Sequence, residues 1–209
     1  MIKSEFESLA GIQISNDTYE RLRAYADLVQ KWNPRINLVS KSQLPALWAR
    51  HIADSAQIQL VAPSEALLWA DFGSGGGFPG IVLAILAQEF APERRFVLVE
   101  SDLRKSAFLM EAARHTGAAV TVKAERAEAL QPLGANVVSA RALASLDMLF
   151  GFCAPHMAEG AIGIFPKGAS YQSEIDAARA KWDFLLQVAP SRTEDAAKIL
   201  IISELRAKA

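Results

Sequence analysis

From Leu67 onward, short apolar runs alternate with longer stretches of helical periodicity, and this alternation restricts the possible folds most strongly. Parallel strands need crossover connections, which helices supply, and those helices then cover both faces of the sheet. The sequence therefore predicts an α/β fold with a mostly parallel seven-stranded sheet. The predicted strands cover residues 66–73, 95–101, 118–124, 135–142, 160–168, 183–190 and 197–205, and the predicted helices cover residues 79–90, 104–117, 145–157 and 173–182.

The last two predicted strands, residues 183–190 and 197–205, follow each other without a helix between them. Antiparallel strands can be joined by a short connection, whereas parallel strands cannot. We therefore expect a hairpin that gives the sheet an antiparallel edge.

The first third of the chain has the apolar spacing of helices. Residues 15–32 repeat apolar side chains at helical intervals, and Ser15, Asn16 or Asp17 can cap the start of this helix. Pro34 is expected to end it.

Residues 42–60 predict a further helix. The chain should thus consist of a helical extension, residues 1–66, packed on a domain that spans residues 67–209. A length of 209 residues with 51% hydrophobic side chains agrees with one domain plus an extension.

Composition also narrows the class of protein. The single cysteine, Cys153, excludes an internal disulfide framework and a cysteine-built zinc site, and no metal is expected. No apolar run is long enough to cross a bilayer, and the N-terminal residues lack a signal-peptide core. We expect a monomeric cytoplasmic protein without a stable protein partner.

The net charge of −1 hides a local basic bias. Clustered cations favour polyanions through counterion release, although a solvated helix face would look the same. Residues 21–50 contain six cations, Arg21, Arg23, Lys31, Arg35, Lys41 and Arg50, against the single acidic residue Asp27.

The stretch "ADFGSGGGFPGIVLAI", residues 70–85, places five glycines within eight residues directly after the first predicted strand. In open α/β sheets, ligands bind beyond the carboxyl ends of the strands. Glycine permits a positive φ and a close approach of backbone to ligand, and Pro79 suits the first turn of the following helix. The loop is therefore predicted to hold a small ligand with polar or anionic groups.

Two ligand classes fit this loop. Residues 75–80 match the dinucleotide pattern G-x-G-x-x-G, and residues 71–77 match D-x-G-x-G-x-G, the pattern of S-adenosylmethionine (AdoMet) methyltransferases. Asp71 ends the first strand, where its carboxylate is expected to meet a ligand ammonium directly or through water. AdoMet has such an amino-acid end and NAD does not. Glu100, which ends the second strand, would bind the ribose hydroxyls of either ligand, and AdoMet is preferred because a dehydrogenase would need a further substrate domain.

Several motifs between Trp32 and Gly168 point to one family. They are "WNPRINLVS", "RHIADS", "DFGSGGGFPGI", "ESDLRKSAFL", "SARALASL" and "FPKG". Together they resemble the bacterial small-subunit ribosomal RNA guanine-N7 methyltransferases, the RsmG/GidB family. The resemblance implies a Rossmann-like class I methyltransferase fold, AdoMet as methyl donor with S-adenosylhomocysteine as product, and 16S rRNA of the small ribosomal subunit as substrate, at guanine 527.

The resemblance also implies roles for single residues. For the cofactor it implies Gly73, Gly75, Gly77 and Phe78 in the loop, Glu100 at the ribose, Ala127 and Glu128 beside the adenine, and Arg141 near the reacting centre. Arg141 and Lys167 are the expected catalytic residues. The expected RNA contacts are Lys105, which matches a basic position of the family beside the site, and Arg35, Lys41 and Arg50, which belong to the basic segment of residues 21–50. Phe78 is the candidate for stacking on the base, although it could also pack under the cofactor.

Asn136 departs from the acidic residue that is frequent at this position in the family, and we interpret it as a surface change. His51 and Asp54 lie three residues apart, and we expect them to pack the extension against the domain. Guanine N7 carries no proton, so its methylation needs no general base. Two alternatives stay open: an AdoMet enzyme acting on a small molecule or protein, and a binding module without activity.

Overall fold

The computed structural model describes residues 1–208 and contains a seven-stranded sheet with the order β3-β2-β1-β4-β5-β7-β6. All pairs from β3 to β5 are parallel, and β7 runs antiparallel to both β5 and β6. This confirms the mostly parallel sheet and the terminal hairpin. The strands are β1 (Leu68–Phe72), β2 (Arg95–Val99), β3 (Val120–Lys123), β4 (Ala135–Ala140), β5 (Met157–Lys167), β6 (Trp182–Pro190) and β7 (Lys198–Ala207).

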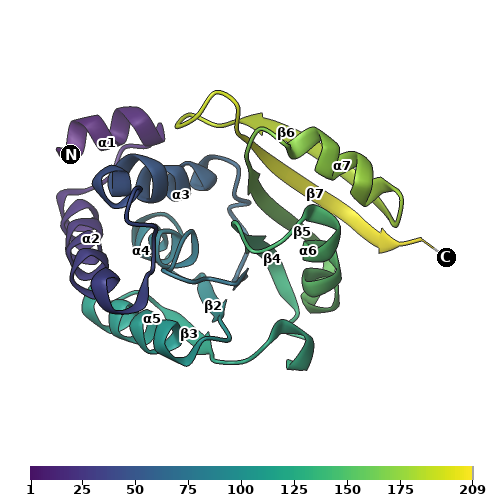
Figure 1. Cartoon of the computed structure of the whole chain (residues 1–209), viewed down its shortest axis with the longest axis horizontal. Helices are drawn as coiled ribbons and strands as arrows, with labels where there is room; N and C mark the ends of the chain where they lie inside the picture. Colours follow the sequence, from purple (N-terminus) through teal and green to yellow (C-terminus); the bar gives the residue numbers. More distant parts are fainter. Residues whose placement is uncertain (209) are drawn as a thin grey trace.

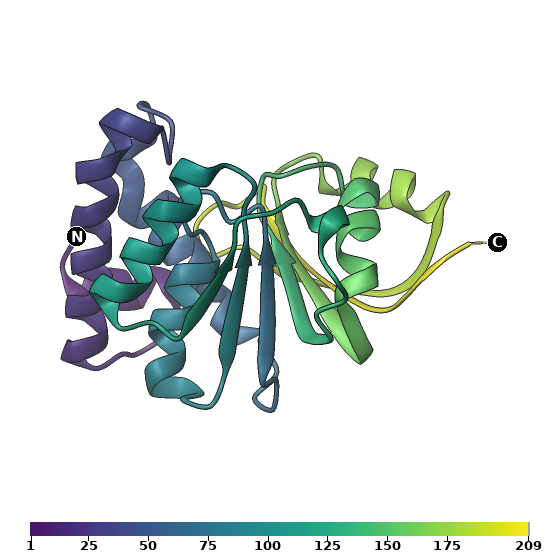
Figure 2. The ribbon, with the colours of Figure 1, turned by 90° about the horizontal axis from the view of Figure 1, so that it is seen from below.

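Helices cover both faces of this sheet (Figures 1 and 2). The face covered by α2, α4 and α5 and the face covered by α6 and α7 form two separate clusters of buried apolar side chains. Residues 80–87 of the helix α4 are buried on all sides, as expected of a helical stretch without polar side chains. The main helices are α1 (Lys3–Ala10), α2 (Asn16–Ile36), α4 (Gly80–Phe90), α5 (Leu103–Thr116), α6 (Leu146–Cys153) and α7 (Tyr171–Arg179).

The prediction that Pro34 ends the helix α2 was wrong by two residues. Pro34 lies in the last turn, and the helix continues to Ile36. A proline there removes only one backbone hydrogen bond, whereas Asn37 in the left-handed conformation (φ 46°) ends the helix. The start agrees with the prediction, because the Ser15 hydroxyl accepts the Thr18 N–H at 3.1 Å.

The second predicted helix, residues 42–60, is not one regular α-helix. Its central part, residues 48–53, has the wider π-helical turn, and the flanking turns are tighter. Such irregular turns are frequent at functional sites. The segment consists of the 3-10 turn η1 (Leu44–Ala46), the π-turn η2 (Trp48–Ala53), α3 (Asp54–Ala56) and the 3-10 turn η3 (Gln57–Leu60).

Residues 1–66 share a hydrophobic core with the rest of the chain. Phe6, Tyr25 and Ile52 of this segment are completely buried and belong to the same cluster as Ile85 of α4 and Phe108 of α5. The extension therefore packs against one face of the sheet domain as an integral layer (Figure 1). A domain boundary at residue 66 stays a prediction.

The parallel register brings the loops after β1, β2 and β4 together. Phe72 pairs with Val99 on one side and with Ala140 on the other, so the three strands end at the same level. Their connecting loops emerge at one end of the sheet (Figure 2). At the opposite end, the Asn136 side-chain oxygen accepts the N–H groups of Leu67 and Leu68 at 3.1 and 2.9 Å, which anchors the start of β1.

Candidate cofactor and substrate site

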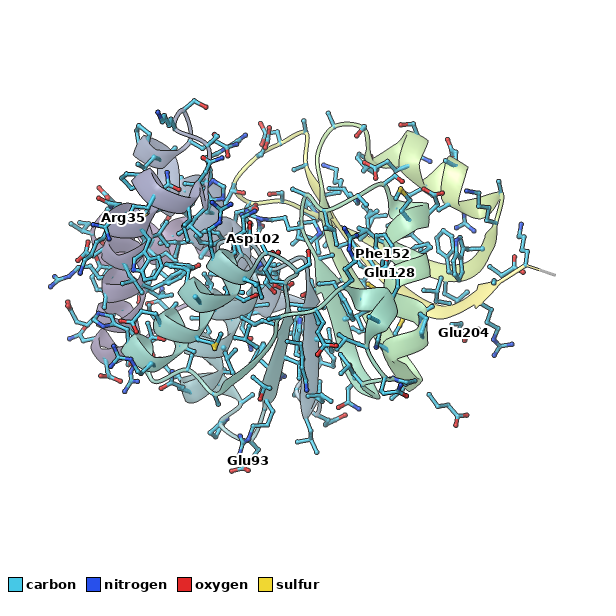
Figure 3. The ribbon with its side chains drawn as sticks, turned by 60° about the horizontal axis from the view of Figure 1, so that its bottom comes forward. Arg35, Glu93, Asp102, Glu128, Phe152 and Glu204 are labelled. Atoms are coloured by element: carbon cyan, nitrogen blue, oxygen red, sulfur yellow. The ribbon has the colours of Figure 1, made fainter. Side chains whose placement is uncertain are left out.

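A cavity of about 310 Å³ lies at the carboxyl ends of β1 and β2, and we call it the glycine-loop cavity. It contains five of the predicted cofactor residues and one predicted RNA contact, Lys105. Glu128 and Phe152, both labelled in Figure 3, contribute to its wall. The lining residues are Phe72, Gly73, Gly75, Val99, Glu100, Ser101, Lys105, Glu125, Arg126, Ala127, Glu128, Ala142, Leu143 and Phe152.

The glycines of the loop adopt conformations that other residues avoid. Gly73 has a φ of 64°, and Gly75 has a φ of 54°. A Cβ atom on Gly73 would lie 2.6 Å from the side chain of Leu143, whereas one on Gly75 would find no atom closer than 3.7 Å. The loop backbone thus forms one side of the cavity and leaves space next to Gly75.

Glu100 ties the loop to the end of β2. Glu100 is 8% exposed and lines the cavity. Its carboxylate accepts the Gly75 N–H at 2.9 Å and the Asp102 N–H at 2.8 Å. An acidic group with remaining lone pairs at this position fits the ribose role that the resemblance implies.

Asp71 points into the protein rather than into the cavity. It is completely buried, and its two carboxylate oxygens accept the Ser139 hydroxyl at 2.7 Å and the Gly80 N–H at 3.2 Å. Burial raises the pKa of Asp71 to about 6. In this geometry Asp71 fixes the loop to the start of α4, and a contact with a ligand ammonium stays a prediction.

Gly77 and Phe78 are buried, and neither is part of the cavity wall. The Phe78 ring lies 5.4 Å from the Tyr25 ring and 5.1 Å from the His51 ring, centroid to centroid. The Arg141 guanidinium lies 5.3 Å from the Phe78 centroid. With an exposure of 5%, Phe78 packs beneath the site, so the geometry favours packing over stacking on a base.

A second cavity of about 560 Å³ adjoins the first, and we call it the arginine cavity. The two cavities share Ala142 and Leu143 in the loop after β4. The extension, this loop, the end of β5 and the β6–β7 turn all contribute to its wall. The lining residues are Gln43, Arg50, His51, Asp54, Gln57, Arg141, Ala142, Leu143, Ala144, Pro166, Lys167, Gly168, Glu174, Ser191, Thr193, Glu194, Ala197, Lys198 and Ile199.

Arg141 is held by the extension. One guanidinium nitrogen donates to the Arg50 carbonyl at 3.1 Å and to the Asp54 carboxylate at 3.2 Å, and the other donates to His51 Nδ1 at 2.6 Å. Desolvation, followed by the nearby charge of Arg141, lowers the pKa of His51 to about 4. His51 is therefore neutral at pH 7 and serves as the acceptor of this bond.

Asp54 extends this network to the terminal hairpin. Its second oxygen accepts the Thr193 hydroxyl at 2.6 Å and the Gln57 amide at 2.8 Å. The expected role of His51 and Asp54 in packing the extension agrees with these contacts. The contributions of Gln57 and Thr193 were missed by the sequence interpretation, since they lie far apart in the chain and match no motif.

Lys167 is 9% exposed, and its hydrogen bonds hold the loop that follows β4. Its ammonium group donates to the Ala144 carbonyl at 2.8 Å and to the Glu174 carboxylate at 2.7 Å. Lys167 thus lines the arginine cavity while it orders the segment that separates the two cavities.

The predicted RNA contacts do not form one cluster. Arg35 and Lys41 are exposed at and beyond the end of α2, and Figure 3 shows Arg35 on the outside of the molecule. Arg50 is exposed at the arginine cavity and forms an ion pair with Glu194 at 2.9 Å. Lys105 lies at the glycine-loop cavity.

Residues 1–208 contain neither a metal-binding cluster nor a helix that could cross a membrane. Within residues 1–208, no group of three or more His, Cys, Asp and Glu side chains has the arrangement of a metal site. None of the helices in this range combines the length and the apolarity that a membrane crossing requires.

Solved structures share this fold at low sequence identity. The O-methyltransferase from Bacillus cereus in complex with SAH superimposes with a TM-score of 0.59 at 13% identity and covers 96% of both chains. TYW2 from M. jannaschii in complex with AdoMet has a TM-score of 0.56 at 10% identity and covers 76% of both chains. These similarities establish the Rossmann-like methyltransferase fold.

Other proteins have a much higher sequence identity to this chain. The chain is 52% identical over 192 residues to the ribosomal RNA small subunit methyltransferase G of Ruegeria pomeroyi, covering 92% of this chain and 94% of the relative. It is 47% identical over 195 residues to the protein of the same name from Parvibaculum lavamentivorans, covering 92% and 85%. The family model GidB, rRNA small subunit methyltransferase G, matches residues 18–198. The chain therefore belongs to the GidB family of rRNA small subunit methyltransferases.

Proposed function

We propose that this protein transfers the methyl group of AdoMet to N7 of a guanine in the 16S rRNA of the small ribosomal subunit. The observation that carries the proposal is the pair of adjoining cavities, which share Ala142 and Leu143. One cavity has the glycine loop and a strand-end acid, and the other has arginine and lysine side chains. Family membership supplies the rRNA substrate. We place the enzyme in the cytoplasm, acting as a monomer.

The residues around the glycine-loop cavity fit AdoMet. Its volume of about 310 Å³ is in the range of small-molecule sites. Gly73 and Gly75 let the backbone approach a ligand, and the Glu100 carboxylate offers acceptors for ribose hydroxyls. Ala127 and Leu143 supply apolar surface for an adenine ring. When bound, AdoMet provides an electrophilic methyl group on a positively charged sulfur.

The arginine cavity is the proposed place of the target guanine. Guanine N7 has an in-plane lone pair and no proton, so the protein needs to orient the base rather than deprotonate it. The contacts of Arg141 with Arg50, His51 and Asp54 fix the guanidinium in one orientation. We infer that Arg141 donates to O6 of the guanine or to a phosphate, where a cation is favourable.

Lys167 plays an indirect part in this proposal. It holds Ala144 and Glu174, and thereby the loop that lies between methyl donor and acceptor. Arg35, Lys41, Arg50 and Lys105 would contact the RNA backbone. Since His51 is neutral and already accepts a hydrogen bond from Arg141, it is not available as a base at pH 7.

Transfer of tritiated methyl groups from AdoMet tests the proposal. We expect label in the 16S rRNA of small subunits from cells that lack this protein, and mass mapping should locate it on guanine N7. Label in a small molecule or in protein, or binding of AdoMet without transfer, would contradict the proposed substrate. Naked 16S rRNA and assembled small subunits should be compared in the same assay.

The pH profile tests the chemistry. Single-turnover rates with saturating AdoMet should stay nearly constant from about pH 7 to 9, above the range in which Asp71 and His51 titrate. Variants H51N and D54N should keep this flat profile. A rate that depends on one titrating group near neutrality, and loses this dependence in one of the variants, would indicate a general base and a different acceptor atom.

A further inference from the structure

The last part of the glycine loop does not face a ligand. Gly73 and Gly75 line the glycine-loop cavity, whereas Gly76, Gly77 and Phe78 are buried on its far side. The "GGFPG" ending of the motif therefore has a purpose other than direct contact with the cofactor. The helix α2 of the extension lies against it.

Tyr25 makes the central contact between α2 and this segment. It is completely buried, and its hydroxyl donates to the Gly76 carbonyl. A Cβ atom on Gly77 would lie 2.7 Å from the same hydroxyl. The Tyr25 ring packs on Phe78, with a centroid distance of 5.4 Å.

The Tyr25 hydroxyl remains the donor in the hydrogen bond to the Gly76 carbonyl. Burial raises the pKa of Tyr25 well above 10, so the group stays protonated and acts as a donor at all physiological pH values. A buried carbonyl without its donor is costly. The Gly76 peptide would have to find another partner if the hydroxyl were removed, and this would release the turn that starts at Gly73.

We propose that Tyr25, from the helical extension, is a positioning residue for AdoMet, because it holds the glycine loop in its binding conformation. The inference rests on the proposed cofactor site. It gives the extension a part in cofactor binding in addition to its proposed part in RNA binding. Loops that are binding-competent for only part of the time bind their ligand correspondingly more weakly.

Two tyrosine variants on the same helix test this. Y25F removes the hydroxyl from the Gly76 carbonyl and keeps the ring. Y19F is the matched control, since the Tyr19 hydroxyl donates to the Met1 carbonyl at 2.7 Å, outside both cavities. Calorimetry with AdoMet should give a Kd about tenfold higher for Y25F than for wild type and an unchanged Kd for Y19F.

Kinetics separate positioning from general destabilisation. We expect Y25F to raise the KM for AdoMet about tenfold and to leave kcat within about twofold, because saturating cofactor restores the loop. If Y25F and Y19F bind AdoMet equally well, Tyr25 has no positioning role. If wild type does not bind AdoMet, the cofactor proposal itself is wrong, and the two failures are thus distinguishable.

A measurement that does not use Y25F covers the case in which this variant does not fold. The chain has three tyrosines, so the wild-type protein can be labelled with 3-fluorotyrosine and observed by fluorine NMR. AdoMet should shift the resonance of Tyr25 and leave that of Tyr19 in place, with the assignment from Y19F and Y171F. A Tyr25 resonance that does not respond to saturating AdoMet would overturn the inference.

Discussion

The glycine-loop cavity and the arginine cavity adjoin each other but are built in different ways. The first is formed largely by loops that directly follow β1, β2 and β3, and its polar groups include backbone N–H groups and one buried carboxylate. The second combines side chains from the extension, the loop after β4, β5 and the terminal hairpin, and its charged groups pair across these segments. A site made from backbone tolerates few changes of conformation, whereas a site made from paired side chains depends on distant parts of the chain.

The largest expected effect comes from G73V in the glycine-loop cavity. Valine would adopt a positive φ only under strain, and its Cβ would meet the Leu143 side chain at 2.6 Å. We expect AdoMet affinity to fall by more than about 100-fold, measured by calorimetry.

The control for this variant is G134V. Gly134 has nearly the same φ, 65° compared with 64°, but has no atom within 4 Å of an added Cβ. Both variants should lose about 1–2 kcal/mol of stability through strain, and only G73V should lose the cofactor. Equal loss of AdoMet binding in both variants would mean that backbone strain, and not the cavity, is responsible.

In the arginine cavity, R141A should slow methyl transfer about 100-fold at saturating AdoMet while AdoMet affinity stays within about threefold. The reason is that Arg141 lines only the arginine cavity. Single-turnover rates and calorimetry measure the two effects. R179A is a suitable control, because the Arg179 guanidinium also lies over a phenylalanine ring, 4.6 Å from Phe184, away from both cavities. A parallel loss of affinity and rate in R141A would show that the cavities do not act separately.

Two buried groups, Asp71 behind the glycine loop and His51 in the wall of the arginine cavity, should give opposite pH dependences of stability. The pKa of Asp71 is raised from 3.8 to about 6, so its contribution to the free energy of unfolding falls as pH rises from about 4 to 6. The pKa of His51 is lowered from 6.5 to about 4, so its contribution rises as pH rises from about 4 to 6.5. Each change should be on the order of 2–3 kcal/mol.

Denaturant unfolding of D71N and H51N between about pH 4 and 7 measures these contributions. Relative to wild type, D71N should gain stability as pH rises, and H51N should lose it. The same direction of change in both variants would contradict the assignment of the two groups.

The smallest effect is expected for three exposed cations of the extension, of which only Arg50 borders a cavity. Replacing Arg35, Lys41 and Arg50 by alanine should flatten the dependence of log K on log salt concentration by about 0.7–0.9 for each lost phosphate contact. AdoMet affinity should not change. The alanine triple variant of Arg114, Arg206 and Lys208 removes the same charge from other exposed positions and serves as the control. If both triple variants have the same salt dependence, the first three residues form a solvated surface only.

Much of the architecture followed from local sequence patterns. The order of strands and helices after Leu67, the hairpin at the end and the glycine loop at a strand end were all predicted, because burial on one or both faces of an element leaves a periodic pattern. Glu100 was placed at the cavity for the same reason, since residues that end neighbouring parallel strands must meet.

The tertiary structure alone decided which way the side chains of the loop face. Asp71 and Phe78 belong to the same motif as Gly73, but Asp71 turns toward Ser139, and Phe78 turns toward Tyr25 and His51. These partners lie far away along the chain. Phe78 is 27 positions from His51 and 53 from Tyr25, and Asp71 is 68 positions from Ser139. No local period encodes such a distance, because the burial of a side chain depends on which distant element packs over it.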